Sequence, residues 1–171
     1  IVGGTIPVGV GLGLSLSLEK TNNLSCVFLG DGSIEEGVFY ESLNFACVRK
    51  LPVLFVCENN FFSVYSPLTV RQPEGRKIHE MVKAVGCQTS QGDGNDLVET
   101  WNLLSEAINH IRKGQGPYFV ELHTFRWREH CGPFFDDNLG YRNPDLVEYW
   151  MKKDPIPNIT QTLLNQEVIS Q

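Results

Sequence analysis

The chain has 171 residues, of which 42% are hydrophobic and 20% are charged, and its net charge is −6 at neutral pH. This length fits one domain with one hydrophobic core. The acidic balance argues against nucleic acid as a partner, because a phosphate backbone needs clustered Lys and Arg, and no apolar run approaches the roughly 18 residues that span a bilayer.

The first predicted element is a helix over residues 7–19, with Thr5 as its cap and a proline at its first position. Gly9, Gly11 and Gly13 lower the helix propensity of this segment. A nucleotide-binding fingerprint would need a further glycine at position 14, where the chain has leucine. We therefore expect the glycines to let the helix pack closely on a sheet.

The centre of the chain alternates apolar runs with helical patterns. Runs at 24–29, 52–57 and 118–123 predict buried strands, and 87–90 predicts a shorter one. Strands separated by helices predict an α/β fold with a doubly wound parallel sheet that has helices on both faces. The predicted helices cover residues 35–50, 78–85, 96–114 and 144–153, and a loop spans 124–143.

The helix expected before Gly114 has the clearest pattern. Asp96 and Glu99 have the spacing of a capping box. Apolar residues then recur at helical spacing, which predicts the face that packs on the sheet. This predicted stripe consists of Leu97, Trp101, Leu104, Ile108 and Ile111.

The five cysteines are odd in number and show no Cys-x-x-Cys spacing. Two of them lie in predicted strands, where free cysteine behaves as a small hydrophobic residue. We expect a reducing compartment, without a disulfide framework or a zinc site. The five are Cys26, Cys47, Cys57, Cys87 and Cys131.

Polar residues follow two consecutive predicted strands. Gly30-Asp31-Gly32 ends the first, and Asn59-Asn60 follows the second, with one crossover helix between them. Such a unit brings the ends of both strands to one edge of a parallel sheet, so Asp31 and Asn60 are expected to be neighbours. A carboxylate and an amide oxygen suit a hard divalent cation, which completes its shell with phosphate oxygens and water. An ordinary turn into a helix is the alternative interpretation.

The residues around Asp31 would have distinct roles in such a site. Gly30 and Gly32 allow the backbone to approach a diphosphate. A helix that begins near Ser33 would point its positive end at the phosphate oxygens. A second Gly-Asp-Gly, at 92–94, has Leu122 where the matching amide would stand, so we interpret it as a turn into the helix capped by Asp96.

The spacing of GDGS and the later NN resembles the thiamin diphosphate motif. The surrounding text, GDGSIEEGVFYESLNFACVRKLPVLFVCENNFFSV, resembles the alpha subunit of the decarboxylating component of 2-oxo acid dehydrogenase complexes. Further blocks (VGGTIPVGVGLGL, QGDGND and FRWREH…YRNPD) extend the similarity from residue 1 to about 156. The resemblance implies a thiamin diphosphate-binding fold over 1–156, truncated at its N-terminus, with 157–171 as an extension or the start of a further segment.

The resemblance also implies a set of site residues. Asp31, the side chain of Asn60 and the backbone carbonyl of Phe62 would bind Mg²⁺. Val64 would occupy the position whose aliphatic side chain wedges between the two rings of thiamin diphosphate. Three further residues correspond to family positions at the cofactor: Val2 and Gly3 at the pyrimidine ring, and His130 at the diphosphate and the active-site entrance, where it would act catalytically.

The chain departs from the family pattern in the loop that carries His130. Cys131 and Gly140 stand where the regulated mammalian enzymes carry phosphorylatable serines, which favours an unregulated bacterial-type protein. Such a protein would be cytoplasmic, whereas a eukaryotic one would be in the mitochondrial matrix. Arg128 replaces a family histidine, which leaves the substrate open. Arg126 and Arg128 fit equally well as solvated residues of a basic, aromatic segment.

The implied reaction is oxidative decarboxylation of a pyruvate-like or branched-chain 2-oxo acid, with acyl transfer to a lipoyl group on a partner acyltransferase. The family alpha subunit works with a beta subunit, so an alpha2-beta2 heterotetramer is expected. Two alternatives stay open. One is an acetoin-cleaving or transketolase-like thiamin enzyme, and the other is an inactive scaffold or interaction fragment without a cofactor.

Overall fold

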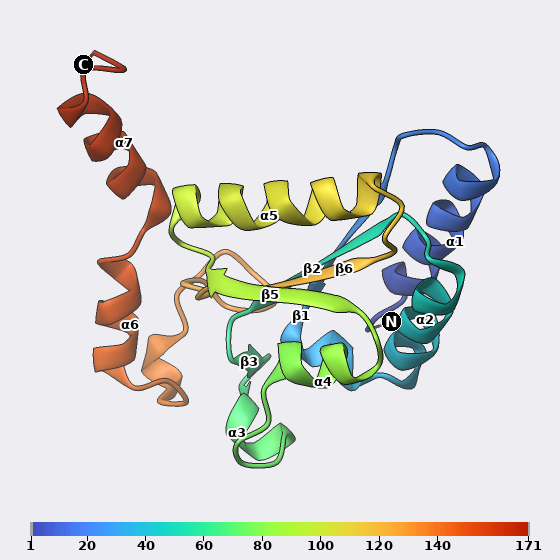
Figure 1. The fold of residues 1–171 in the computed structure, drawn as a ribbon. Coiled ribbons are helices and arrows are strands. Elements are labelled where there is room, and N and C mark those ends of the chain that lie inside the picture. The colour runs from blue at the N-terminus through green and yellow to red at the C-terminus, as the bar shows by residue number, and fades with distance from the viewer. Residues whose placement is uncertain (1, 171) are drawn as a thin grey trace.

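The computed structural model describes residues 2–170, in which four parallel strands form the central sheet in the order β1-β2-β6-β5 (Figure 1). The register pairs Gly30 with Glu58 and Asn59 with His123. The carboxyl ends of all four strands therefore lie along one edge. The strands are β1 (Ser25–Gly30), β2 (Val53–Asn59), β5 (Gln88–Asp93) and β6 (Tyr118–His123).

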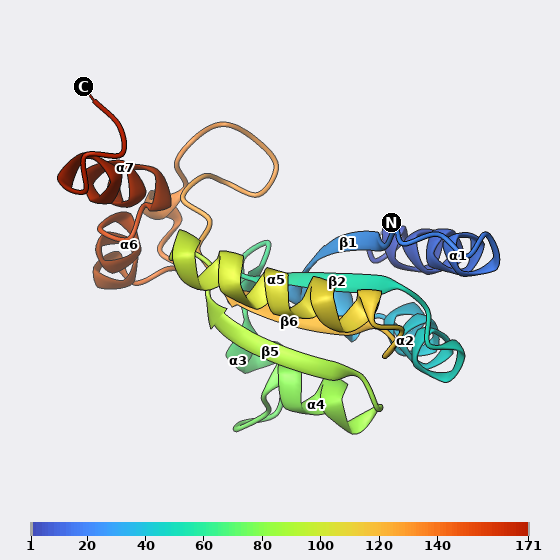
Figure 2. The same ribbon diagram turned by 45° about the horizontal axis from the view of Figure 1, so that its top comes forward.

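Helices cover both faces of this sheet, as Figures 1 and 2 show. One face packs against α1 (Thr5–Leu18), α2 (Gly37–Arg49) and α4 (Ile78–Ala84), and α5 (Leu97–Arg112) packs on the opposite face. Alternate residues of β2 supply both cores, because successive side chains of a strand point to opposite faces. The predicted doubly wound α/β fold is confirmed. The two cores include Val53, Phe55 and Cys57 on the first face, and Leu54 and Val56 on the second.

Two of the three glycines of α1 are needed for its packing on the sheet. A Cβ at Gly9 would lie 2.2 Å from a methyl of Val27, and one at Gly13 would lie 2.4 Å from a methyl of Val53. Gly11 faces open space. Close packing thus explains Gly9 and Gly13 only. The predicted cap is wrong, because Thr5 is the first helical residue and Gly4 occupies the cap position.

The predicted α5 begins as expected, and three residues of its predicted stripe, Leu104, Ile108 and Ile111, pack on the sheet. Asp96 caps it by accepting hydrogen bonds from the backbone N–H groups of Val98 and Glu99, at 2.9 and 3.0 Å. Trp101 of the predicted stripe is 73% exposed, and Leu97 is also exposed. The packed face is rotated from the predicted one, because Leu103 and Ala107 face the sheet in place of Leu97 and Trp101. The side chains that pack on the sheet are Leu103, Leu104, Ala107, Ile108 and Ile111.

The segment predicted as one helix over 35–50 contains a break. A 3-10 turn, η1 (Asp31–Glu35), comes first, and Glu36 is extended with ψ of 137° before α2 begins at Gly37. Ser33 therefore lies inside a short turn and does not begin a helix, which corrects that expectation. The second strand also continues further than predicted and includes Asn59.

The remaining elements are short and lie beyond the carboxyl edge of the sheet. A two-stranded hairpin follows Asn60. The domain boundary expected at residue 156 falls inside α7 and stays a prediction. Within residues 2–170, no helix is both long and apolar enough to cross a membrane. These elements are β3 (Phe62–Ser63), β4 (Ser66–Pro67), α3 (Leu68–Arg71), η2 (Asp137–Leu139), α6 (Pro144–Met151) and α7 (Pro155–Asn165).

Candidate functional site

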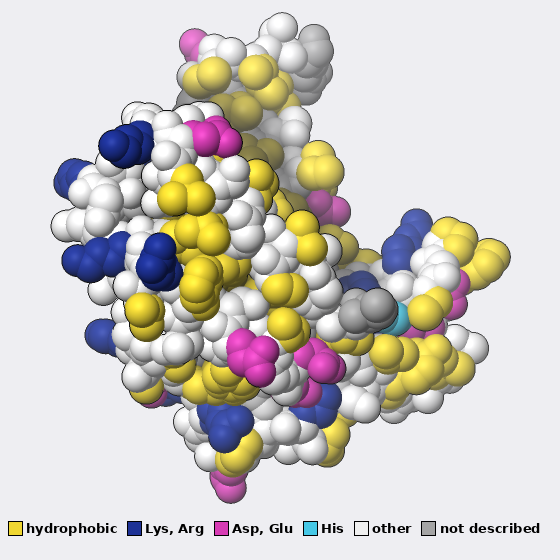
Figure 3. Space-filling model, turned by 90° about the vertical axis from the view of Figure 1, so that its right-hand side faces the viewer, with side chains coloured by type: hydrophobic (Ala, Val, Ile, Leu, Met, Phe, Trp, Pro, Cys, Tyr) yellow, Lys and Arg dark blue, Asp and Glu magenta, His cyan; other side chains and the backbone are white. Residues whose placement is uncertain are grey.

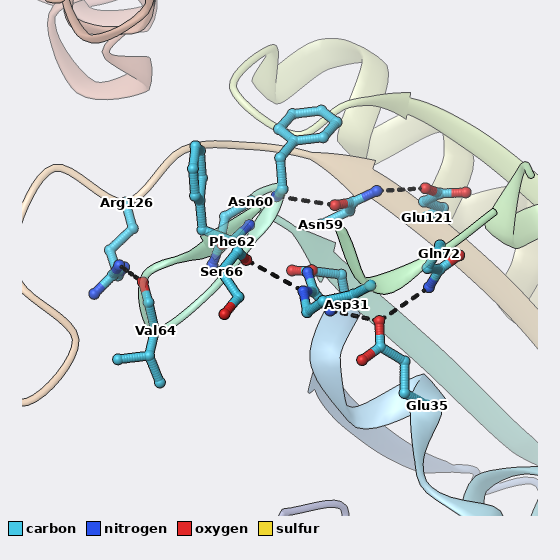
Figure 4. Close-up of polar contacts among 12 residues, drawn as sticks. Asp31, Glu35, Asn59, Asn60, Phe62, Val64, Ser66, Gln72, Glu121 and Arg126 are labelled. Atoms are coloured by element: carbon cyan, nitrogen blue, oxygen red, sulfur yellow. Dashed lines mark hydrogen bonds and ion pairs between the residues drawn. The ribbon is translucent and has the colours of Figure 1, made fainter. Parts of the chain in front are cut away.

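Asp31 and Asn60 come together at the carboxyl edge of the sheet. Asp31 directly follows β1 and Asn60 directly follows β2, its parallel neighbour. The backbone N–H of Asn60 lies close enough to the carboxylate of Asp31 to lower its pKa. Figure 4 shows this carboxylate next to the turn that carries Asn60 and Phe62. The predicted convergence of these two residues is confirmed.

The carboxylate of Asp31 is buried, with only 1% of the residue exposed. Burial raises its pKa above the ordinary value, and hydrogen bonding to Arg71, the Arg71 charge and the Asn60 N–H oppose that rise. A buried carboxylate needs a cationic or hydrogen-bonding partner to remain ionised. The position of Asp31 is therefore one that attracts a cation.

The turn after β2 is shaped by the two asparagines. The Oδ1 atoms of Asn59 and Asn60 accept hydrogen bonds from the backbone N–H groups of Phe61 and Phe62, both at 3.0 Å. Such Asx bonds are a known reason for asparagine in turns. Phe61 has a positive φ of 67°, so the chain turns sharply directly after Asn60.

Glu121 of β6 fixes Asn59 from the neighbouring strand. Its Oε1 accepts a hydrogen bond from Asn59 Nδ2 at 2.7 Å, and its Oε2 accepts one from the His79 N–H at 3.0 Å. Two imidazoles also contact this buried carboxylate, His79 Nδ1 at 3.1 Å and His123 Nε2 at 3.3 Å. The pKa of Glu121 is lowered, because the hydrogen bonds from His123, Asn59 and His79 outweigh desolvation.

The hairpin that follows Asn60 holds Val64 in an uncommon conformation. Ser63 pairs with Ser66, so Val64 is the first residue of a two-residue turn, and its φ is 54°. Glycine is favoured at such a position, and a branched side chain there costs on the order of 1–3 kcal/mol. The guanidinium of Arg126 donates to the Val64 carbonyl at 2.8 Å, as Figure 4 shows.

Arg126 is itself held by the loop before α6. It also donates to the Tyr141 hydroxyl at 3.1 Å, and that hydroxyl donates to Asp136 at 2.7 Å. Arg142 is buried and pairs with Asp136 and Asp137. The interpretation of Arg126 as a solvated residue is wrong, since the late loop uses it to support the hairpin.

The other predicted site residues lie further from this convergence or show no contact with it. Gly3 is buried against the start of α2 with a φ of 73°, and Val2 beside it is exposed. His130 is exposed on the 124–136 loop, and among residues 2–170 no hydrogen bond joins it to Asp31 or Asn60. Arg128 is also exposed and donates to the Pro133 carbonyl. The roles expected for these residues stay predictions.

The donor atoms around Asp31 fit a divalent cation. Asn60 Oδ1 accepts one hydrogen bond and, as an amide oxygen, has a second lone pair. Pro67, which pairs with Phe62 across the hairpin, has no N–H to occupy the Phe62 carbonyl. A Cβ at Gly30 would meet no atom within 4 Å, so the backbone before Asp31 borders open space. No group of three or more His, Cys, Asp and Glu residues that could hold a metal occurs in 2–170, so this site would depend on amide, carbonyl and phosphate oxygens.

Arg71 is a site residue that sequence reasoning missed. Its guanidinium pairs with the carboxylates of both Asp31 and Glu35. It lies forty residues from Asp31 along the chain, in a segment without a periodic pattern. Only its charge, close after the asparagine pair, could have drawn attention to it.

Comparison with known proteins places the chain in a family. The sequence profile described as "Dehydrogenase E1 component" matches residues 1–171. The chain belongs to the dehydrogenase E1 component family. It is 32% identical over 171 residues to the pyruvate dehydrogenase E1 component subunit alpha of Rickettsia felis. It is also 34% identical over 151 residues to the 2-oxoisovalerate dehydrogenase subunit alpha of Bacillus subtilis, which covers 88% of this chain and 45% of that relative.

The match to the first of these relatives covers all of this chain and 51% of the relative, so the chain spans about half the length of such E1 alpha subunits. A solved structure described as a candidate thiamin diphosphate-dependent enzyme from Mycobacterium smegmatis superimposes with a TM-score of 0.55. It covers 74% of this chain and 22% of its own, at 21% sequence identity. This structural similarity supports the α/β fold described above for the chain.

Proposed function

We propose that the protein binds the diphosphate of thiamin diphosphate through Mg²⁺ and acts as the alpha part of a 2-oxo acid dehydrogenase. The observation that carries this proposal is the buried carboxylate of Asp31 next to Asn60 at the carboxyl edge of the sheet. Membership of the E1 family supports it, as do relatives named pyruvate and 2-oxoisovalerate dehydrogenase alpha subunits.

The chain's own residues would position the cofactor. Asp31, Asn60 and the Phe62 carbonyl would hold the metal ion, and the metal would neutralise the diphosphate. Val64 would contact the cofactor rings from a turn that Arg126 holds in place. When bound, thiamin diphosphate supplies the nucleophilic carbon and the electron sink for decarboxylation.

A partner subunit is part of the proposal. Figure 3 looks onto the side of α1 and α2 and shows hydrophobic side chains exposed between charged ones. On these helices Val8, Leu12, Leu18, Phe45 and Val48 are exposed. Exposed apolar side chains in such number are typical of surfaces that associate. We propose a beta subunit as the partner and a lipoyl-bearing acyltransferase as the acyl acceptor.

Binding of the cofactor tests this function. Calorimetric titration of the full-length protein, assembled with its beta partner, should show thiamin diphosphate binding that depends on Mg²⁺. Asp31→Asn should weaken this binding about a hundredfold or more, because it removes the only carboxylate proposed for the metal. Asp93→Asn, from the second Gly-Asp-Gly, is the matched control and should bind normally. Equal binding by Asp31→Asn and the wild type would contradict the proposal.

A second candidate function uses the same cofactor on another substrate. Arg128 stands at a position where the family carries a histidine, so the substrate could be acetoin or a ketol. A panel of substrates with an artificial electron acceptor distinguishes these reactions. Oxidation of pyruvate or a branched-chain 2-oxo acid supports the first function, and acetoin cleavage or ketol transfer supports the second.

A further inference from the structure

The guanidinium of Arg71 joins three acceptors at the candidate metal site. Its Nη2 pairs with Oδ2 of Asp31, and its Nη1 donates to Oε1 of Glu35 at 2.5 Å. Its Nε donates to the Ser66 carbonyl in β4 at 3.2 Å. The arginine side chain is only 11% exposed. These contacts fasten the hairpin and α3 to η1.

Arg71 places its positive charge against the Asp31 carboxylate, which is also the proposed metal ligand. Asp31 is almost fully buried, so its charged form needs a cationic partner. Arg71 supplies that positive charge, and Glu35, a third exposed, shares it. Gln72, the next residue, donates to the same Glu35 oxygen at 3.3 Å. The segment that follows the turn with Asn60 and Phe62 therefore supplies a cationic side chain to Asp31.

We propose that Arg71 and a divalent cation compete for the carboxylate of Asp31, so that metal binding requires Arg71 to withdraw. This inference rests on the proposed function, because it concerns the same metal site. Two cations next to one carboxylate repel each other, and the repulsion is strong where water is excluded. Arg71 lies in the same stretch of chain as Asn60, eleven residues later. Its withdrawal would free the segment that also carries Asn60 and Phe62 to close on the ion.

The substitution Arg71→Gln tests the competition with a readout other than activity. It removes the positive charge and leaves Asp31 buried without a cationic partner. The full-length protein with its beta partner is titrated with MgCl₂ at saturating thiamin diphosphate and melted with and without the metal. We expect Mg²⁺ to bind about tenfold more tightly to the variant. We also expect a lower metal-free melting temperature and a larger increase when Mg²⁺ is added.

Two further variants keep the test interpretable. Arg112→Gln removes the same charge from the exposed end of α5, on the opposite face of the sheet from α2, and should change neither quantity. Arg71→Lys keeps a positive charge but loses the planar fork that bridges two carboxylates, so its Mg²⁺ affinity should lie between the other two. This variant also serves if Arg71→Gln does not fold.

The outcomes separate this inference from the proposed function. Equal or weaker Mg²⁺ binding by the Arg71 variants would overturn the competition, since Arg71 would then assist the ion or be irrelevant to it. Absence of Mg²⁺ binding in both the wild type and the variants would overturn the proposed function and the competition together. Tighter Mg²⁺ binding by the Arg71 variants, with normal binding by Arg112→Gln, supports both.

Discussion

Glu121 and His123 hold each other in their charged forms next to the turn that carries Asn60. The pKa of His123 is raised above 6.5, chiefly by its hydrogen bond to Glu121, and that of Glu121 is lowered below 4.5. Asp93 and Glu99 add to the rise in His123, and His79 contacts the other oxygen of Glu121. The stability that this pair contributes therefore depends on pH.

The pair predicts a window of full stabilisation. The contribution of His123 to the free energy of unfolding is fully present below its ordinary pKa of 6.5. It is lost as pH rises through the raised pKa. The contribution of Glu121 is present above its ordinary pKa of 4.5 and is lost as pH falls through the lowered pKa. Chemical denaturation of wild type and His123→Gln should differ most between pH 4.5 and 6.5, by about 1 kcal/mol or less because His123 is partly exposed. A constant difference across pH 4 to 9 would contradict this coupling.

Residues at strand ends were predictable, whereas the cations that contact them were not. Asp31 and Asn60 follow directly from the end of an apolar run and the geometry of parallel strands. Arg71 ends the four-residue helix α3 and Arg126 lies in a loop, and segments this short carry no period that relates sequence position to direction. A charged residue in a loop looks solvated in sequence, and only the folded chain shows that both arginines bind groups of the candidate site.

The packing of α1 gives a prediction at the scale of an element. Gly13→Ala would place a methyl 2.4 Å from Val53 in β2, so the helix must shift, and we expect a loss of about 1–3 kcal/mol in the free energy of unfolding. Gly11→Ala adds the same methyl in open space and should stabilise by about 0.5–1 kcal/mol. Urea denaturation of both variants measures the contrast. Equal effects would show that α1 does not depend on this close approach.

Element types were predicted better than the details at their ends. Apolar runs identified the four strands of the sheet, and helical spacing identified α4 and α5. Capping residues, prolines and the room between strands indicated α1, α2 and α6. The break at Glu36 was missed, because no proline or glycine marks the extended residue itself. In the predicted stripe of α5, Leu97 and Trp101 were wrong. Helical spacing defines a face only approximately, and the observed face is rotated towards Leu103 and Ala107.

At the scale of the whole molecule, we expect the isolated chain to lack decarboxylase activity. The chain spans about half the length of its E1 alpha relatives, and the proposed reaction needs a beta subunit. Oxidative decarboxylation should appear when the full-length protein is mixed with its beta partner, and an artificial acceptor assay measures it. Full activity without the partner would contradict this expectation.

β1, the strand that leads to Asp31, is an edge strand of the sheet. β1 has a strand neighbour on one side only within the described part of the chain, whereas β2, which leads to Asn60, is paired on both sides. Edge strands open locally more readily than the central strands of a core. An ion shared by the two strand ends would fasten an edge strand to a central one. The cofactor would then be a structural component of the fold that receives it, as well as the reagent.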